Sequence, residues 1–183
     1  MFRTIALMIM AVFAASPATA ANSPFYGHPE KFGQWVSHTV PGAGYAYTDT
    51  RSGASLGYTC QGACNYYVHL LDQCEPGRRY DLALSSEGAQ FKISAPCRVA
   101  GHWQYFVIDD PRVLGLIEGQ SIAVSMIAGK QQSAPQTFPL EGAKQAIALA
   151  RQQWIQSLAG GDQPPAHGLD LPPPPIIIVP PMR

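Results

Sequence analysis

The most reactive side chains in this chain of 183 residues are those of four cysteines, which all lie between positions 60 and 97. They are Cys60, Cys64, Cys74 and Cys97. Cysteine thiols can attack substrates, bind zinc or form disulfides. The spacing C-x3-C-x9-C-x22-C is poor for a zinc site, and thiolates outside the cytosol tend to be oxidised. Four cysteines in an oxidising compartment therefore predict two disulfides.

Chain geometry limits how these cysteines can pair. If one strand ran from Cys64 to Cys74, its ends would lie roughly 30 Å apart, whereas a disulfide needs Cα atoms within about 7 Å. That distance argues against a Cys64–Cys74 bond. Cys60 and Cys64 flank a three-residue loop and could face each other across a hairpin. The favoured pairing is Cys60–Cys64 with Cys74–Cys97, and Cys60–Cys74 with Cys64–Cys97 stays open.

Other residue types offer little catalytic chemistry. The histidines fall in separate segments, without the spacing of metal ligands, and no G-x-S-x-G motif occurs. Asp109 and Asp110 form a pair of carboxylates, but they precede Pro111, which is a common turn arrangement. We therefore predict no catalytic residues, no metal and no cofactor. The histidines are His28, His38, His69, His102 and His167.

Two groups of side chains are candidates for binding. Arg78 and Arg79 could receive an anionic group, although a solvated turn also explains them. Tyr45 and Tyr47, with the nearby pair Tyr66-Tyr67, could form a recognition surface, because tyrosine is enriched at interfaces. In a sandwich, at least half of these tyrosines should belong to the core.

Short β-rich runs occupy most of the chain between residues 32 and 127. In residues 45–50, tyrosine and aspartate alternate with smaller side chains, which is the period of a strand with two unlike faces. Runs this short need two stacked layers to bury a core. The sequence thus predicts an all-β protein, a disulfide-stapled β-sandwich. The expected strands are 32–36, 45–50, 56–60, 64–71, 80–84, 90–94, 103–108 and 121–127.

One helix is expected near the C-terminal end of the domain. From Leu140 through Trp154 the apolar residues recur in steps of three or four, which places them on one helical face. Leu158 could extend this stripe before Gly160 and Gly161 end the helix. We expect the helix to pack on one end of the sandwich; an exposed amphipathic helix that binds a membrane or a partner is the alternative.

The N-terminal end of the chain differs in composition from the domain. Residues 1–20 read as a signal peptide, with Arg3, an apolar core and an A-x-A cleavage site at Ala18 to Ala20. Residues 21–31 form a polar lead, and residues 32–159 form the domain. Export predicts a location in the periplasm, in the secreted fraction or at the outer cell surface.

Residues 160–183 are rich in proline, which favours extended polyproline II conformation and a disordered or semi-rigid tail. Within this tail, Ile176, Ile177 and Ile178 form an apolar cluster with Val179. The cluster is a candidate docking motif, and a tail without a role is the alternative.

Charge and hydropathy exclude some partners. The formal net charge is +0 and 13% of residues are charged, so no basic patch indicates a nucleic-acid binder. No second long apolar run follows the signal peptide, so the mature chain should lack a transmembrane segment. The expected partner is therefore an unknown protein.

Three short patterns resemble the invasion-associated locus B family. They are Phe32-Gly33-Gln34-Trp35, then Leu116-x-x-Gly119-x-x-Ile122-x-Val124, then a segment that contains Phe138, Leu140, Gly142, Ala146 and Leu149. The resemblance covers residues 32–155. It implies a small exported bacterial protein with a β-sandwich and a C-terminal helix, and it brings no catalytic residues.

These observations predict an exported, non-enzymatic β-sandwich that acts by protein–protein contact, with a role in host interaction. The alternatives are an exported hydrolase with an unrecognised site and an inhibitor of a host or rival enzyme.

Overall fold

The computed structural model describes residues 29–40 and 42–159, which form an antiparallel β-structure with two helices. The predicted signal peptide, most of the polar lead, the proline-rich tail and the Ile176–Ile178 cluster lie outside these residues. The strands are β1 (Glu30–Phe32), β2 (Trp35–Val40), β3 (Ala43–Asp49), β4 (Ser55–Gln61), β5 (Ala63–His69), β6 (Arg79–Ser86), β7 (Ala89–Ala100), β8 (Trp103–Ile108), β9 (Ser121–Ala128), β10 (Gln131–Gln132) and β11 (Gln136–Pro139). The helices are α1 (Arg112–Leu116) and α2 (Ala143–Ala159).

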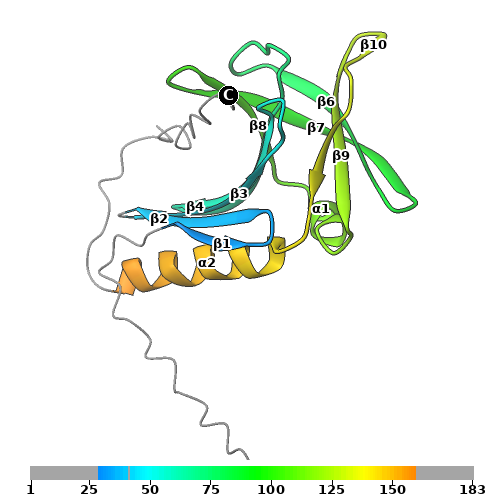
Figure 1. The fold of residues 1–183 in the computed structure, drawn as a ribbon. Helices are drawn as coiled ribbons and strands as arrows, with labels where there is room; N and C mark the ends of the chain where they lie inside the picture. The colour runs from blue at the N-terminus through cyan, green and yellow to red at the C-terminus, as the bar shows by residue number, and fades with distance from the viewer. Residues whose placement is uncertain (1–28, 41, 160–183) are drawn as a thin grey trace, which may run out of the picture.

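The strands form two layers that share β7. The larger layer has the order β1-β2-β3-β4-β5-β8-β7, and the smaller layer continues through β6 and β9, with β10 and β11 both paired to β9. Residues 89–96 of β7 pair with β6, and residues 97–100 pair with β8. The long strand therefore passes from one layer into the other (Figure 1). This arrangement confirms the predicted all-β, sandwich-like fold.

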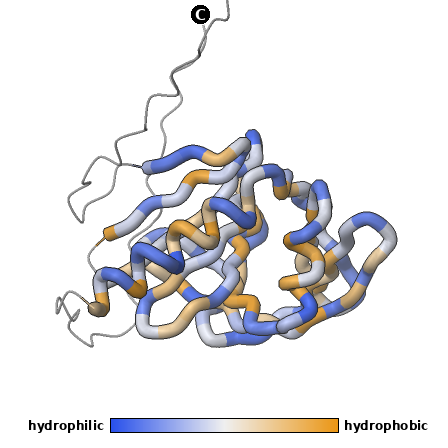
Figure 2. Tube along the Cα trace, turned by 90° about the horizontal axis from the view of Figure 1, so that it is seen from below, coloured by the Kyte–Doolittle hydropathy of each residue, from blue (hydrophilic) through white to orange (hydrophobic). Residues whose placement is uncertain are grey.

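Helix α2 packs on the larger layer, as predicted. Ala143, Ala146 and Ala150 are fully buried against the strands, and Gly44 of β3 faces the backbone of Ala150 so closely that a Cβ at position 44 would overlap it. Small residues on both elements let the helix approach the sheet. Figure 2 shows hydrophilic and hydrophobic residues alternating along this helix. The apolar stripe does not extend to Leu158, which is 42% exposed.

The main core lies between α2, the larger layer and the smaller layer. Trp35, Leu56 and Phe106 of the larger layer meet Leu82 and Val124 of the smaller layer in one buried cluster. The helix and the smaller layer therefore cover the same face of the seven-stranded sheet. The opposite face of that sheet has a separate, smaller cluster, which is described below.

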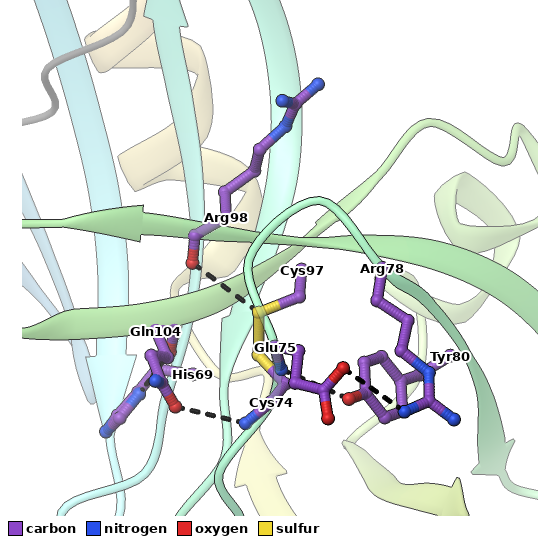
Figure 3. Close-up of a disulfide and its surroundings, with 8 residues drawn as sticks. All are labelled: His69, Cys74, Glu75, Arg78, Tyr80, Cys97, Arg98 and Gln104. Atoms are coloured by element: carbon purple, nitrogen blue, oxygen red, sulfur yellow. Dashed lines mark hydrogen bonds and ion pairs between the residues drawn. A yellow bond between two sulfur atoms is a disulfide. The ribbon is translucent and has the colours of Figure 1, made fainter.

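The disulfides follow the favoured pairing. Cys60 bonds Cys64 across the β4–β5 hairpin, and Cys74 bonds Cys97. Cys97 lies where β7 changes layers, and its backbone N–H and C=O bond the turn at Arg78 and Gly77. The second disulfide therefore holds the β5–β6 connection onto the junction of the two layers (Figure 3). Disulfides of this kind persist in oxidising compartments.

Candidate functional site

The seven-stranded sheet is curled, and one of its faces is concave. In Figure 1 the strands rise from β1 and β2 through β3 and β4 towards β8, while α2 lies outside the curve. Gly44 and Ala46 of β3 point towards α2 and the main core. Because side chains alternate along a strand, Tyr45 and Tyr47 point to the inside of the curve.

Four tyrosines come together on this concave face. Tyr47, Tyr67 and Tyr105, from β3, β5 and β8, are nearly fully buried and share one cluster, and Tyr45 lies beside them. The rings of Tyr67 and Tyr105 are 6.2 Å apart and meet edge to face, which is a favourable aromatic geometry. We call Tyr45, Tyr47, Tyr67 and Tyr105 the tyrosine face.

A glycine on β4 makes room for the central ring. Gly57 stands opposite Tyr67 in the strand register, and a Cβ at Gly57 would overlap the phenol ring. The ring of Tyr67 therefore lies across the backbone of β4 instead of beside it. This packing explains why a glycine occupies the interior of a central strand, where glycine is otherwise unfavourable.

The environment of the tyrosine face keeps its phenols protonated. Burial, followed by the nearby phenol of Tyr105, raises the pKa of Tyr45 to about 12. Burial is also the main cause that raises the pKa of Tyr67, with Asp49 second.

A row of polar side chains crosses one end of this face. His38, Tyr45, Thr59 and Asn65 are successive partners on β2, β3, β4 and β5. His38 Nδ1, Tyr45 Oη and Thr59 Oγ1 are buried, as is Gln61 Oε1 two positions further along β4, and none has a hydrogen-bond partner among the described residues. We call His38, Tyr45, Thr59 and Gln61 the polar row. Buried polar atoms are normally hydrogen-bonded, so four such atoms without a partner in one row are unusual.

At the other end of the concave face, the polar side chains already have hydrogen-bond partners. His69 stacks on Trp103 with ring centroids 4.5 Å apart, and its Nδ1 lies 2.7 Å from the carbonyl oxygen of Gln104. Asp49 accepts a hydrogen bond from Ser55. The unmet hydrogen-bonding capacity of the concave face is thus concentrated at the polar row.

The arginine pair lies elsewhere, at the start of β6. Arg78 forms an ion pair with Glu75 at 3.3 Å and covers the ring of Tyr80, and Arg79 donates to Ser94. Both guanidinium groups have partners within the protein (Figure 3 shows Arg78). The structure does not bring the arginines and the tyrosine face together, and binding by Arg78 and Arg79 stays a prediction.

The carboxylate pair serves a turn. Asp110 accepts hydrogen bonds from the backbone N–H and the side chain of Arg112, and these bonds lower the pKa of Asp110 to about 2. Among residues 29–40 and 42–159, no three side chains of the metal-binding types come together. An open depression of about 480 Å³ at the β6–β7 turn is lined mostly by small and polar residues, including Ser86 and Glu87. Ser86 donates a hydrogen bond to the carbonyl of Ser121, and Glu87 accepts one from the backbone N–H of Gln120.

Sequence reasoning missed part of this site. Tyr45 and Tyr47 were candidates, and the structure places both on the tyrosine face. Tyr66 points to the opposite face and contacts Tyr58. Tyr105, His38 and Thr59 were not candidates, because only strand register brings them beside Tyr45. The alternation of side chains along β8 was the one available signal for Tyr105.

Comparison with known proteins supports the fold. The chain is an all-β protein of two joined layers with a C-terminal helix. No family model and no curated protein matches it. Among solved structures, it is similar to the crystal structure of invasion associated protein B from Bartonella henselae. The match covers 71% of this chain and 99% of that chain, with a TM-score of 0.52 and 11% sequence identity. The resemblance predicted from the sequence motifs is therefore confirmed at the level of the fold.

No helix in the described part of the chain is long and apolar enough to cross a membrane.

Proposed function

We propose that this protein is exported, has no catalytic activity and acts by protein–protein contact in the periplasm or at the outer cell surface, through its concave tyrosine face. The observation that carries the proposal is the polar row beside that face. Its buried donors and acceptors have no partner among the described residues. A protein partner that supplies those hydrogen bonds would remove their desolvation cost.

Composition and fold support this proposal. Tyrosine offers a large contact area at low conformational cost, and it is enriched in interfaces and among their hot spots. The solved structure with a similar fold is named as an invasion associated protein. By analogy of fold alone, we extend the proposal to contact with a host.

The experiment compares variants in capture assays. The purified chain serves as bait against periplasmic and host-cell extracts, and Tyr45→Ala is compared with the unmodified chain. Loss of a hot-spot tyrosine should weaken a specific partner about 30-fold, which corresponds to at least 2 kcal/mol. Ile155→Ala is the matched control, because Ile155 is 50% exposed on α2, on the other side of the sheet.

Each variant should retain the circular dichroism spectrum of the unmodified chain at the assay temperature, although Tyr45→Ala is expected to lower the melting temperature because it removes a partly buried ring. Equal loss of the partner with Ile155→Ala, or a hydrolytic activity that disappears with Tyr45→Ala, would contradict the proposal.

A further inference from the structure

We propose that the free edge of β7 can pair with the same edge of a second copy of this chain, and that Arg79 and Arg112 keep this edge closed by binding its carbonyl oxygens. The proposal concerns the smaller layer and does not depend on the tyrosine face. It rests on the strand register, on the hydrogen bonds of the two arginines and on the charge of the edge.

Residues 89–96 of β7 have a strand on one side only. All of them pair with β6, whereas β8 pairs with residues 97–100 and then leaves the strand. The other edge strands of the described residues, β1, β10 and β11, have only two to four residues. The stretch 89–96 is therefore the longest unpaired edge in the part of the chain that the structure describes, and edges of this kind invite pairing with another chain.

The hydrogen-bond pattern of the β6–β7 hairpin fixes which backbone groups of β7 face outward. The turn Glu87-Gly88 has two residues, both with positive φ, so the residues on either side of it form a hydrogen-bonded pair. The backbone N–H of Cys97 continues this pattern with a bond to the carbonyl oxygen of Arg78. Successive residues of a strand direct their backbone groups to opposite sides, so every second residue between these points faces away from β6. The three outward-facing residues are Gln90, Lys92 and Ser94.

Arginine side chains occupy two of the three outward carbonyl oxygens. Arg112 Nη2 donates to the carbonyl of Lys92 at 3.2 Å, and Arg79 Nη2 donates to the carbonyl of Ser94. Asp110 holds Arg112 in this position, because it accepts hydrogen bonds from Nε and Nη2 of the same guanidinium group. A strand that pairs with this edge must first displace both arginines from the carbonyl oxygens.

Two residues of β7 itself also oppose pairing. Lys92 is exposed at the centre of the edge and places a positive charge there. Pro96 takes the next outward position and has no N–H to offer. Proline occurs in strands mainly where its N–H would face outward, so Pro96 also agrees with the register.

A second copy is the occupant that the symmetry of this edge fits. With a two-fold axis at Lys92, Gln90 of each copy would lie opposite Ser94 of the other, and the antiparallel strands would form about six backbone hydrogen bonds. Such a contact uses the same surface on both chains, as in the commonest type of dimer. It would also bring the two Lys92 side chains together, and like charges directly opposite each other destabilise a sheet. The arginines and this repulsion therefore act together to keep the intact chain monomeric.

The test is sedimentation velocity of the purified chain over a range of concentrations. The unmodified chain should be monomeric throughout. The double variant Arg79→Ala/Arg112→Ala frees both carbonyl oxygens and should form dimers, with a dissociation constant lower by at least about tenfold, as expected for the loss of charge-assisted hydrogen bonds. The control is Arg98→Ala/Lys130→Ala, which removes two exposed cations away from residues 89–96 and should stay monomeric.

Hydrogen exchange followed by NMR locates the contact. The N–H groups of the three outward-facing residues should exchange rapidly in the unmodified chain and become protected in the dimer. Addition of Lys92→Pro to the double variant should restore the monomer, because proline removes an outward donor without breaking a bond to β6. If Arg112→Ala lowers the folded fraction, Arg112→Lys replaces it. Lysine keeps the charge beside Asp110 but lacks the planar fork that reaches both acceptors.

Circular dichroism checks that each variant is folded. A folded double variant that stays monomeric would overturn the proposal, as would a dimer in which the three N–H groups stay unprotected or which Lys92→Pro leaves intact. Dimerisation of the unmodified chain through the same edge would show that the arginines do not close it, and would overturn the proposal as well. None of these results bears on the capture of a partner by the tyrosine face.

Discussion

The indole Nε1 of Trp35 donates a hydrogen bond to the carbonyl oxygen of Pro139 at 2.8 Å, across 104 positions of sequence. Around this bond, Gly142 approaches the carbonyl of Phe32 so closely that it has no space for a Cβ, and the backbone N–H of Gln34 donates to Glu141. Two of the family-like motifs therefore pack against each other and join the first strands to the entry of α2.

The first prediction concerns this junction. Trp35→Phe keeps an aromatic ring but removes the N–H group and leaves a space in the core, so the free energy of unfolding should fall by about 2–3 kcal/mol. Urea unfolding measures the change. Trp103→Phe is the control, because Trp103 is only partly buried and lies on His69; it should cost less than about 1 kcal/mol. Equal effects of the two substitutions would contradict the structural role of Trp35.

The second prediction concerns Gly57. Gly57→Ala should destabilise the fold by about 1–3 kcal/mol, because the new Cβ displaces the ring of Tyr67 in a packed cluster. The double variant with Tyr67→Leu should recover part of that loss. Gly115→Ala provides a matched change, since nothing lies near a Cβ at that position of α1. Thermal unfolding of the unmodified chain and the three variants measures these changes in stability. An unaltered melting temperature for Gly57→Ala would contradict the prediction.

The third prediction concerns the disulfides. Mass spectrometry under non-reducing conditions should find all four cysteines oxidised, with Cys74 and Cys97 in one linked peptide pair. Replacement of Cys74 and Cys97 by alanine should cost about 3 kcal/mol, and replacement of Cys60 and Cys64 about 2 kcal/mol, since the longer loop loses more entropy on closure. Free thiols in protein from an oxidising compartment would disprove the pairing.

The fourth prediction concerns alkaline pH. Burial raises the pKa of Tyr45 and of Tyr66 to about 12 from an ordinary value of 10.0. The folded state then holds these protons more tightly than the unfolded state does. This contribution to stability is complete below pH 10 and is lost as the pH rises towards 12.

Phenolate absorbance and circular dichroism should therefore change together above pH 10. Tyr67→Phe removes one of the buried phenols and should reduce the late absorbance step. Ionisation of all tyrosines near pH 10 in a chain that remains folded would refute the prediction.

Several features could be predicted from residue types alone. The alternation in residues 45–50 matches β3, and the stripe predicted from Leu140 to Trp154 matches α2, which begins at Ala143. Both periods are local properties of the backbone. The favoured cysteine pairing also followed from local geometry, since Cys60 and Cys64 flank one hairpin. The predicted strand 32–36 is wrong as one strand, because the chain turns at Gly33 between β1 and β2. The strands β10 and β11 were missed because they have two and four residues, too few to show a period.

The sequence by itself determined the β-structure and the long C-terminal helix, because each depends on spacing within one segment. It favoured the observed cysteine pairing but left a second pairing open, and the tertiary structure decided between them. The tertiary structure alone decided which tyrosines meet. Tyr47 and Tyr105 are 58 positions apart, and they share one cluster with Tyr67 only because the pairing of β3, β4, β5 and β8 places all three on one face of the sheet. The polar row likewise exists only in the register of β2, β3 and β4, where a shift by one residue would turn every one of its side chains to the opposite face.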